Sequence, residues 1–330
     1  MFRFLNIWAS CAAALLARPC LTAEAPAVVF THMADASAGE WLGEGLFVAA
    51  NDEDNALRVY RVPQGGAPVA AWDAAPHLAL APKSPETDIE GSAKLGDTIY
   101  WITSHAPNKS GKPRPNRKRF FATRFSVTNG VPSFQLVGKP VATLLENLDR
   151  DPRYAAFGLA AAALRPPKTQ GSLNIEALCD TPGGGLLIGF RSPVPNDKAL
   201  LAPLENPADT VAGKPPRFGA PLLLDLGGNG IRAMIRTNDS AYLILSGSPR
   251  SGGASRPYRW DGRNAPQRDE ALSGLPADAT PEGLIAIDCD GTPALLVLSD
   301  DGTRLVDGLP AKSHPDPLRR SFRGFIFRSR

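Results

Sequence analysis

The chain has 330 residues, 43% of them hydrophobic, and a formal net charge of +3. This length suits two average domains or one large all-β domain, and the small net charge argues against nucleic-acid binding through an overall basic field. The 31 glycines and 32 prolines separate apolar runs instead of forming a low-complexity tract, so they indicate turns and argue against a disordered chain.

The N-terminus has the pattern of a targeting segment. A short basic start with Arg3 is followed by an apolar stretch over residues 5–17, which is too short to span a bilayer, and then by small residues. Residues 1–23 are therefore predicted to be a signal peptide, and residues 24–330 a single mature domain. We expect the mature chain to be periplasmic or secreted, without a transmembrane segment.

Short segments of one pattern recur along the mature chain. Three of them place a glutamate before a small residue, at Glu90, Glu176 and Glu282, and a fourth carries Arg232 at the equivalent position. Each is soon followed by a turn and an apolar strand, and a weaker copy begins at Ser37. Repetition of such a strand–turn–strand unit is typical of a β-propeller.

The predicted strands group into five units, because short runs bounded by Gly, Asn and Asp favour antiparallel hairpins. In chain order, the units comprise residues 45–50, 57–62 and 68–72; 98–103, 120–125 and 133–137; 185–190 and 221–226; 241–246 and 257–260; and 293–298 and 321–327. The last unit lacks an outer strand, and residues 26–31 supply a candidate. Adding this strand to the sheet that holds Phe325, Ile326 and Phe327 would close a ring and remove an exposed edge.

The sequence therefore predicts an all-β fold, a closed β-propeller of five blades. The long interval between Glu90 and Glu176 leaves open whether the fold has a sixth blade. That interval contains the helical candidate, a short insertion near residues 141–165 with apolar residues at helical spacing. The Pro-rich stretch over residues 193–218 is expected to be a long loop.

Equivalent positions of the innermost strands converge on the central channel of a propeller. Glu90, Glu176 and Glu282 are thus expected to face one another, with Arg232 among them. Carboxylates that share a small site repel each other unless a cation or a shared proton offsets them, and oxygen-rich rings suit Ca²⁺ or Mg²⁺. Two interpretations stay open: a divalent-cation site, or glutamates that cap backbone amides while Arg232 neutralises them.

A basic loop follows the inner hairpin of the second unit, with six Lys or Arg between residues 109 and 119. Clustered guanidinium and ammonium groups suit phosphate or carboxylate, although such a run is also typical of a solvated surface. The strand ends near residue 51 and residue 191 are expected to lie on the same face. The predicted ligand-binding residues are His105, Asn108, Lys109, Lys112, Arg114, Arg117, Arg119, Asn51, Asp52 and Arg191.

The chain has no Gly-x-Ser-x-Gly elbow, His-Glu-x-x-His pair, phosphate-binding loop or dinucleotide-binding glycine pattern. The first predicted function is therefore binding of an anionic small molecule or cell-envelope component on one face. The alternative is a divalent-metal-assisted hydrolase of phosphoesters or esters, in which Glu90, Glu176 and Glu282 hold the cation. The sequence leaves open whether the protein is an enzyme. The cofactor that it suggests is Ca²⁺ or Mg²⁺.

Much of the mature chain resembles an uncharacterised bacterial family known only as a domain of unknown function. The matching residues are 47–55, 104–105, 108–109, 111–112, 114–115, 117, 119–124, 174–178, 223–228 and 230–232. The resemblance implies a β-propeller-like fold and no established activity. More distantly, the repeated glutamate–glycine starts resemble those of phytase-like and esterase-like propellers.

Overall fold

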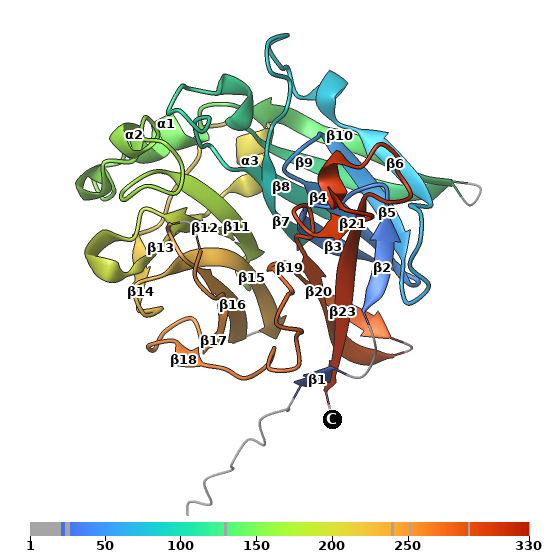
Figure 1. The fold of residues 1–330 in the computed structure, drawn as a ribbon. Coiled ribbons are helices and arrows are strands. Elements are labelled where there is room, and N and C mark those ends of the chain that lie inside the picture. Colours follow the sequence, from blue (N-terminus) through green and yellow to red (C-terminus); the bar gives the residue numbers. More distant parts are fainter. Residues whose placement is uncertain are drawn as a thin grey trace, which may run out of the picture.

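The computed structural model describes residues 21–23, 27–128, 131–238, 241–250, 252–289 and 291–329. Five antiparallel sheets are arranged around a common axis as the blades of a β-propeller (Figure 1). The prediction of a closed five-bladed propeller is confirmed, and the described residues form no sixth blade. The predicted signal peptide lies outside the described residues, apart from the short strand β1 (Leu21–Ala23).

Blades 1 to 4 are each built from consecutive strands, the innermost strand first. Blade 1 contains β3 (Ala36–Gly43), β4 (Leu46–Asn51), β5 (Ala56–Arg61) and β6 (Ala70–Asp73). Blade 2 contains β7 (Ile89–Leu95), β8 (Thr98–Thr103), β9 (Phe120–Thr128) and β10 (Val131–Val141). Blade 3 contains β11 (Asn174–Asp180), β12 (Leu186–Ser192), β13 (Ala199–Leu204) and β14 (Leu222–Leu224). Blade 4 contains β15 (Gly230–Asn238), β16 (Ala241–Gly247), β17 (Arg256–Trp260) and β18 (Gln267–Arg268).

Blade 5 joins the two ends of the described chain. Its strands are β19 (Pro281–Cys289), β20 (Thr292–Ser299), β23 (Ser321–Ser329) and the N-terminal β2 (Val28–Thr31). The predicted closure is confirmed, with β2 paired to residues 321–324 of β23 and β1 paired to residues 327–329. A small hairpin, β21 (Leu305–Val306) and β22 (Leu309–Pro310), lies between β20 and β23 in the sequence.

Hydrophobic cores fill the interfaces between neighbouring blades. At the closure, the Phe30 ring lies 5.1 Å from Phe47, 5.3 Å from Tyr60 and 5.0 Å from Phe322, measured between ring centroids. Phe47 and Tyr60 belong to blade 1 and Phe322 to blade 5, so β2 fastens the first blade to the last. Closure of this kind removes the exposed edge of the last sheet.

The predicted helical insertion is confirmed between blades 2 and 3 (Figure 1). It consists of α1 (Leu144–Arg150), the 3-10 turn η3 (Ala155–Phe157) and α2 (Leu159–Ala162). Other short helices are η1 (Ala75–His77), η2 (Pro115–Arg117), η4 (Pro195–Asp197), α3 (Pro207–Val211) and η5 (Ala311–Ser313). No helix in the described part of the chain has the length and apolar character needed to cross a bilayer.

The expectation of a long loop over residues 193–218 is wrong in part. This stretch contains β13, the third strand of blade 3, and the helix α3. Pro203 is tolerated in β13 because the outer strand β14 pairs only with residues 199–201 and leaves the proline beyond its ladder. The high proline content of the stretch therefore concealed a strand.

Candidate functional site

Each innermost strand carries a β-bulge at the same level. The pairing register skips one residue in every blade, and the extra residues are Ser37, Glu90, Glu176, Arg232 and Glu282. A bulge re-aims the side chain of its extra residue, and these residues meet at the axis. The three glutamates and Ser37 line one narrow cavity of about 20 Å³, which has room for a single water. The predicted convergence of the repeated positions is therefore present.

Gly91 shows why small residues follow the bulges. A Cβ atom there would lie 2.9 Å from the backbone nitrogen of Leu178 and 3.0 Å from the carbonyl carbon of Ala177. Both neighbours belong to the inner strand of the next blade, so only glycine lets β7 approach β11 this closely. The small residue thus brings the inner strands, and their bulges, together.

Two of the three glutamates are held by arginines. Glu282 forms an ion pair with Arg232, and Glu176 accepts a hydrogen bond from Nη1 of Arg191 at 2.7 Å. Glu176 is 6% exposed, and its Oε2 has no hydrogen-bond partner; the nearest cation is Arg232 Nε at 3.9 Å. The interpretation of Arg232 as a neutralising residue agrees with these contacts.

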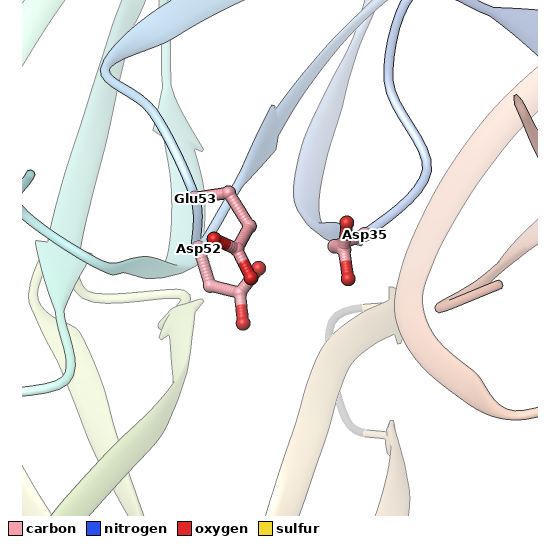
Figure 2. A group of neighbouring side chains, drawn as sticks. All are labelled: Asp35, Asp52 and Glu53. Carbon is pink, nitrogen blue, oxygen red and sulfur yellow. The ribbon is translucent and has the colours of Figure 1, made fainter. Parts of the chain in front are cut away.

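Glu90 instead joins an acidic cluster at the face where the inner strands begin. Carboxylate oxygens of Asp52, Asp88 and Glu90 lie within 4.8 Å of one another, as do those of Asp35, Asp52 and Glu53. Asp35 immediately precedes β3, while Asp52 and Glu53 immediately follow β4. Figure 2 shows these three side chains. Asp52 belongs to both groups. We refer to these five residues as the acidic cluster.

Ionisation is disfavoured at the buried members of the acidic cluster. Burial, reinforced by the neighbouring carboxylates, raises the pKa of Asp52 to about 8 and that of Asp35 to about 7. Burial also raises the pKa of Glu90 well above its ordinary value, with further contributions from Asp88 and Glu176. Lys312 Nζ already lies 2.6 Å from Oε1 of Glu53 and 3.7 Å from Oδ1 of Asp35. A bound cation would therefore act mainly on the repulsion among Asp52, Asp88 and Glu90.

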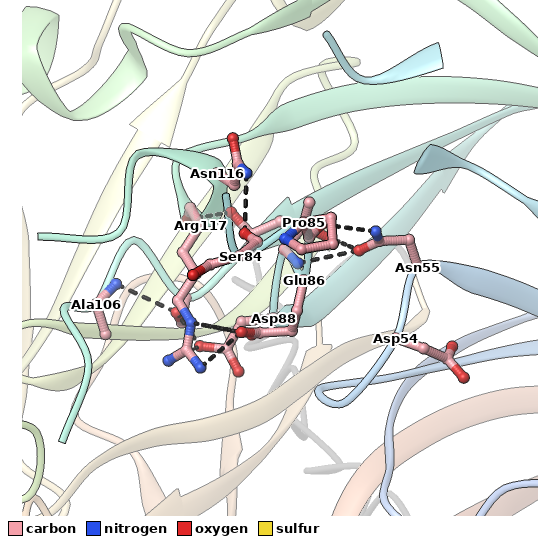
Figure 3. A network of polar contacts seen from close by, with 12 residues as sticks. Asp54, Asn55, Ser84, Pro85, Glu86, Asp88, Ala106, Asn116 and Arg117 are labelled. Carbon is pink, nitrogen blue, oxygen red and sulfur yellow. Dashed lines mark hydrogen bonds and ion pairs between the residues drawn. The ribbon is translucent and has the colours of Figure 1, made fainter. Parts of the chain in front are cut away.

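Asp88 is fixed more firmly than its neighbours (Figure 3). Its carboxylate accepts a hydrogen bond from the Ser104 hydroxyl and pairs with Nη1 of Arg117 at 2.9 Å. Burial raises its pKa to about 6, although the Arg117 charge and the Ser104 hydrogen bond act in the opposite direction. Asp88 has a φ of 61°, a left-handed conformation that Asp tolerates better than most residues.

Three of the six cations of the basic loop are already used within the fold. Arg119 donates hydrogen bonds to four backbone carbonyls, those of Leu78, Ala79, Pro115 and Lys118. Arg117 pairs with Glu86 and Asp88, and Lys118 pairs with Glu146 at 2.7 Å. These three cations stabilise the loop and its surroundings.

The remaining predicted ligand-binding residues lie in different places. The Asn108 side chain accepts backbone hydrogen bonds from Ser110 and Lys112, and Asn51 accepts one from Asp54, so both shape turns. Lys109 and Lys112 are exposed. Asp52 belongs to the acidic cluster and Arg191 to the pair with Glu176. His105 and Arg114 line a separate cavity of about 300 Å³.

Asp35 and Asp88 are not among the residues that the sequence predicts for the site. A signal for both exists in the repeats. Each aspartate stands two positions before the bulge residue of its blade, Asp35 before Ser37 and Asp88 before Glu90. The corresponding positions in blades 3, 4 and 5 are Asn174, Gly230 and Thr280, so only the first two blades place an acid there.

No protein-family model matches the chain, and no curated protein matches its sequence. Among solved structures, the chain is similar to glutaminyl cyclase from Myxococcus xanthus, at 12% identity over 93% of this chain and 96% of that one, with a TM-score of 0.46. It is also similar to the allergen Mala s 1 from Malassezia sympodialis, at 9% identity over 91% and 92%, with a TM-score of 0.43. An engineered GH43 glycoside hydrolase matches at 12% identity over 90% of this chain and 51% of that one, with a TM-score of 0.47.

Proposed function

We propose that the protein is a divalent-cation-dependent hydrolase of phosphoesters or related esters, with its site at the acidic cluster. The observation that carries the proposal is the meeting of carboxylates from blades 1 and 2 around Asp52, within 4.8 Å in each group of three. Asp52, Asp88 and Glu90 would hold the cation. They replace the predicted set of Glu90, Glu176 and Glu282, whose carboxylate oxygens form no such close group of three among the described residues.

The donor set fits Ca²⁺ or Mg²⁺, which both prefer oxygen ligands. Oδ1 of Asp52 is buried and has no hydrogen-bond partner. The same is true of Oε2 of Glu176, a residue that is more than nine-tenths buried and lines the channel beside Glu90. An unpaired buried oxygen costs free energy in the folded state. Binding of a cation would offset this cost at Asp52.

The surrounding residues suit hydrolysis. A divalent cation supplies a Lewis acid that polarises an ester and lowers the pKa of a bound water. Arg117 and Ser104 hold the Asp88 carboxylate in one orientation. The unpaired oxygen of Glu176 is an acceptor for a water proton at the inner side of the cluster. Because the channel cavity next to the bulge residues is only about 20 Å³, we infer that a substrate approaches from the face of the loops.

The first predicted function, binding of an anionic ligand on the basic loop, receives less support. Arg117, Lys118 and Arg119 already meet carboxylates or backbone carbonyls. Such a ligand would have to compete with those contacts. Of the cations in the loop, Arg114 keeps a buried nitrogen without a hydrogen-bond partner.

Metal binding and turnover test the proposal together. Protein purified without chelator is analysed for metal content and titrated with Ca²⁺ and Mg²⁺ by calorimetry. Turnover of p-nitrophenyl phosphate, bis-p-nitrophenyl phosphate and p-nitrophenyl acetate is then measured with and without EDTA. We expect cation binding and EDTA-sensitive turnover, both reduced in Asp52→Asn. Absence of cation binding together with absence of EDTA-sensitive turnover would overturn the proposal.

We also propose that residues 1–23 are removed and that the mature chain acts in the periplasm or outside the cell, as a member of the uncharacterised family that it resembles. Removal would take β1 away and leave β2 as the outer strand of blade 5. Intact-mass measurement of protein from the periplasmic or culture fraction tests this directly. A full-length chain confined to the cytoplasm would contradict it.

A further inference from the structure

A second cavity lies away from the channel, between the basic loop of blade 2 and the helical insertion. Its volume is about 300 Å³, roughly twice that of an engineered cavity of about 150 Å³ that holds benzene. The loop contributes His105 and Arg114 to its wall, and the insertion contributes Leu145, Ala163 and Leu164. We refer to it as the insertion cavity.

His105 gives the insertion cavity an unused hydrogen-bond acceptor. The residue is 1% exposed, and its Nδ1 lies 2.8 Å from the carbonyl oxygen of Thr103. Since a carbonyl only accepts, Nδ1 carries the proton and Nε2 carries the lone pair. Nε2 is buried and has no hydrogen-bond partner.

The surroundings keep His105 neutral. Burial lowers its pKa to about 4, and the positive charges of Lys118 and Arg119 act in the same direction, while Glu146 and the hydrogen bond to Thr103 oppose them. At neutral pH the imidazole therefore stays an acceptor at Nε2. An unsatisfied buried acceptor is uncommon in folded proteins and calls for a donor from elsewhere.

The charges of the insertion cavity favour a ligand with one negative group. Lys118 and Glu146 pair with each other at 2.7 Å, and Asp149 accepts a hydrogen bond from the backbone of Ala160 at 2.9 Å but keeps its charge. Arg150 also lines the cavity, so three cations face two carboxylates. Nε of Arg114 has no hydrogen-bond partner in the described structure. Arg114 is thus a cation with donors to spare, and a guanidinium recognises carboxylates well.

The rest of the wall is largely apolar. Leu145 and Ala163 are buried, while Leu164 is 63% exposed, an unusual position for a large hydrophobic side chain that borders a cavity. Apolar walls with a few well-placed polar groups are typical of small-molecule sites. The ligand would therefore present an apolar ring to these residues.

We propose that the insertion cavity binds a small cyclic carboxylic acid that also carries a hydroxyl group. The hydroxyl donates to Nε2 of His105, the carboxylate pairs with Arg114, and the ring packs against Leu145, Ala163 and Leu164. The site is separate from the acidic cluster, and the proposal does not depend on the proposed hydrolase activity.

Three probes test the proposed chemistry by calorimetry on the full-length folded protein: 4-hydroxybenzoate, benzoate and phenol. We expect 4-hydroxybenzoate to bind most tightly. Benzoate lacks the hydroxyl and should bind about threefold to tenfold more weakly, the usual effect of one hydrogen bond. Phenol lacks the carboxylate and should lose about tenfold or more, since a charge-assisted contact is stronger.

Two variants assign the polar contacts. In His105→Phe, 4-hydroxybenzoate should bind no more tightly than benzoate, because the acceptor is gone. In Arg114→Gln, 4-hydroxybenzoate should bind no more tightly than phenol, because the partner of the carboxylate is gone. EDTA should leave all these affinities unchanged, which separates this site from the cation site.

A matched pair of variants locates the cavity even if His105→Phe fails to fold. Ala160 and Ala161 are neighbouring exposed residues of α2, and of the two only Ala160 lines the cavity. Ala160→Phe should abolish binding of 4-hydroxybenzoate, and Ala161→Phe should leave it unchanged. The proposal is overturned if none of the three probes binds the wild-type protein at millimolar concentration, or if Ala160→Phe binds 4-hydroxybenzoate as the wild type does.

Discussion

Arg232 and Glu282 occupy equivalent bulges in blades 4 and 5, and their side chains form an ion pair across the channel. The two side chains are 11% and 18% exposed, so water screens the pair weakly. Glu176 of blade 3 lies on the other side of Arg232, at 3.9 Å. Arg232 thus lies between two of the carboxylates at the axis, and Arg191 supplies the second positive charge to Glu176.

Removal of Arg232 is expected to destabilise the propeller. Arg232→Met leaves Glu282 as a largely buried carboxylate without its partner, and breaking such a pair costs about 3–5 kcal/mol. Urea denaturation measures the loss. The double variant Arg232→Met/Glu282→Met should be markedly more stable than Arg232→Met, because no unpaired charge remains at that pair. Strictly additive losses in the two single variants and the double variant would contradict this explanation.

Closure of the ring should depend on the Phe30 side chain. Phe30 is fully buried among rings of blades 1 and 5, so Phe30→Ala should lower the free energy of unfolding by about 3–5 kcal/mol. The adjacent Val29 is 46% exposed in the same strand, and Val29→Ala should cost within about 0.5 kcal/mol. Equal losses in the two variants, measured by denaturant unfolding, would show that β2 contributes no core packing.

The repeats made most of this architecture predictable from the sequence. Apolar runs between glycine-rich turns gave the second strand of each blade, the repeated segments before them marked the innermost strands, and the unpaired N-terminal run gave the closure. β13 was not predictable in the same way, because Pro203 and the prolines around the strand are typical of a loop. Its place becomes clear only from its pairing with β12 and β14.

The acidic cluster could be predicted only in part. Glu90 is visible in its repeat and Asp52 at a strand end, but their proximity depends on a bulge that shifts the register of β7 by one residue. In β7 buried and partly exposed residues alternate without a break through the bulge, so hydrophobic alternation gives no sign of it. The basic loop shows the reverse, since its charges are obvious in the sequence while their partners, such as Glu86 and Glu146, come from distant segments.

Cation affinity should depend on the acidic cluster and not on surface acids. Asp52→Asn and Asp88→Asn are each expected to weaken Ca²⁺ binding by about tenfold or more, because each removes a charged oxygen ligand. Asp97 pairs with Arg124 in an exposed hairpin of blade 2, and Asp97→Asn is the matched control. Calorimetric titration measures all three affinities. Unchanged binding in both cluster variants would place any cation site elsewhere.

Arg119 is expected to be a structural residue. Its guanidinium satisfies four backbone carbonyls and holds residues 78 and 79 against the basic loop. Arg119→Met should therefore lower stability by about 2 kcal/mol or more, since buried acceptors lose a charged donor. Lys112→Met, at an exposed position of the same loop, should change stability by less than about 0.5 kcal/mol. Thermal melts compare the two, and equal melting temperatures would contradict the structural role.

Glu40 should make stability fall as pH rises. It lines a further cavity of about 90 Å³ in the channel, with Asp180 and Arg236 nearby, and burial raises its pKa to about 8. The folded state therefore keeps a proton that the unfolded chain releases near its ordinary pKa of 4.5.

Because the folded state binds more protons between these two values, the free energy of unfolding decreases with pH there, by up to about 1.4 kcal/mol per pH unit. This stabilisation is present at low pH and is lost as pH rises towards 8. Glu40→Gln cannot titrate, so its stability should depend less steeply on pH than that of the wild type between pH 5 and 8. Urea denaturation at several pH values gives both slopes. Glu44→Gln, at an exposed residue next to the end of the same strand, is the control and should keep the wild-type slope. If Glu40→Gln also kept that slope, Glu40 would be ionised in the folded protein, and the pH dependence would have to come from other groups.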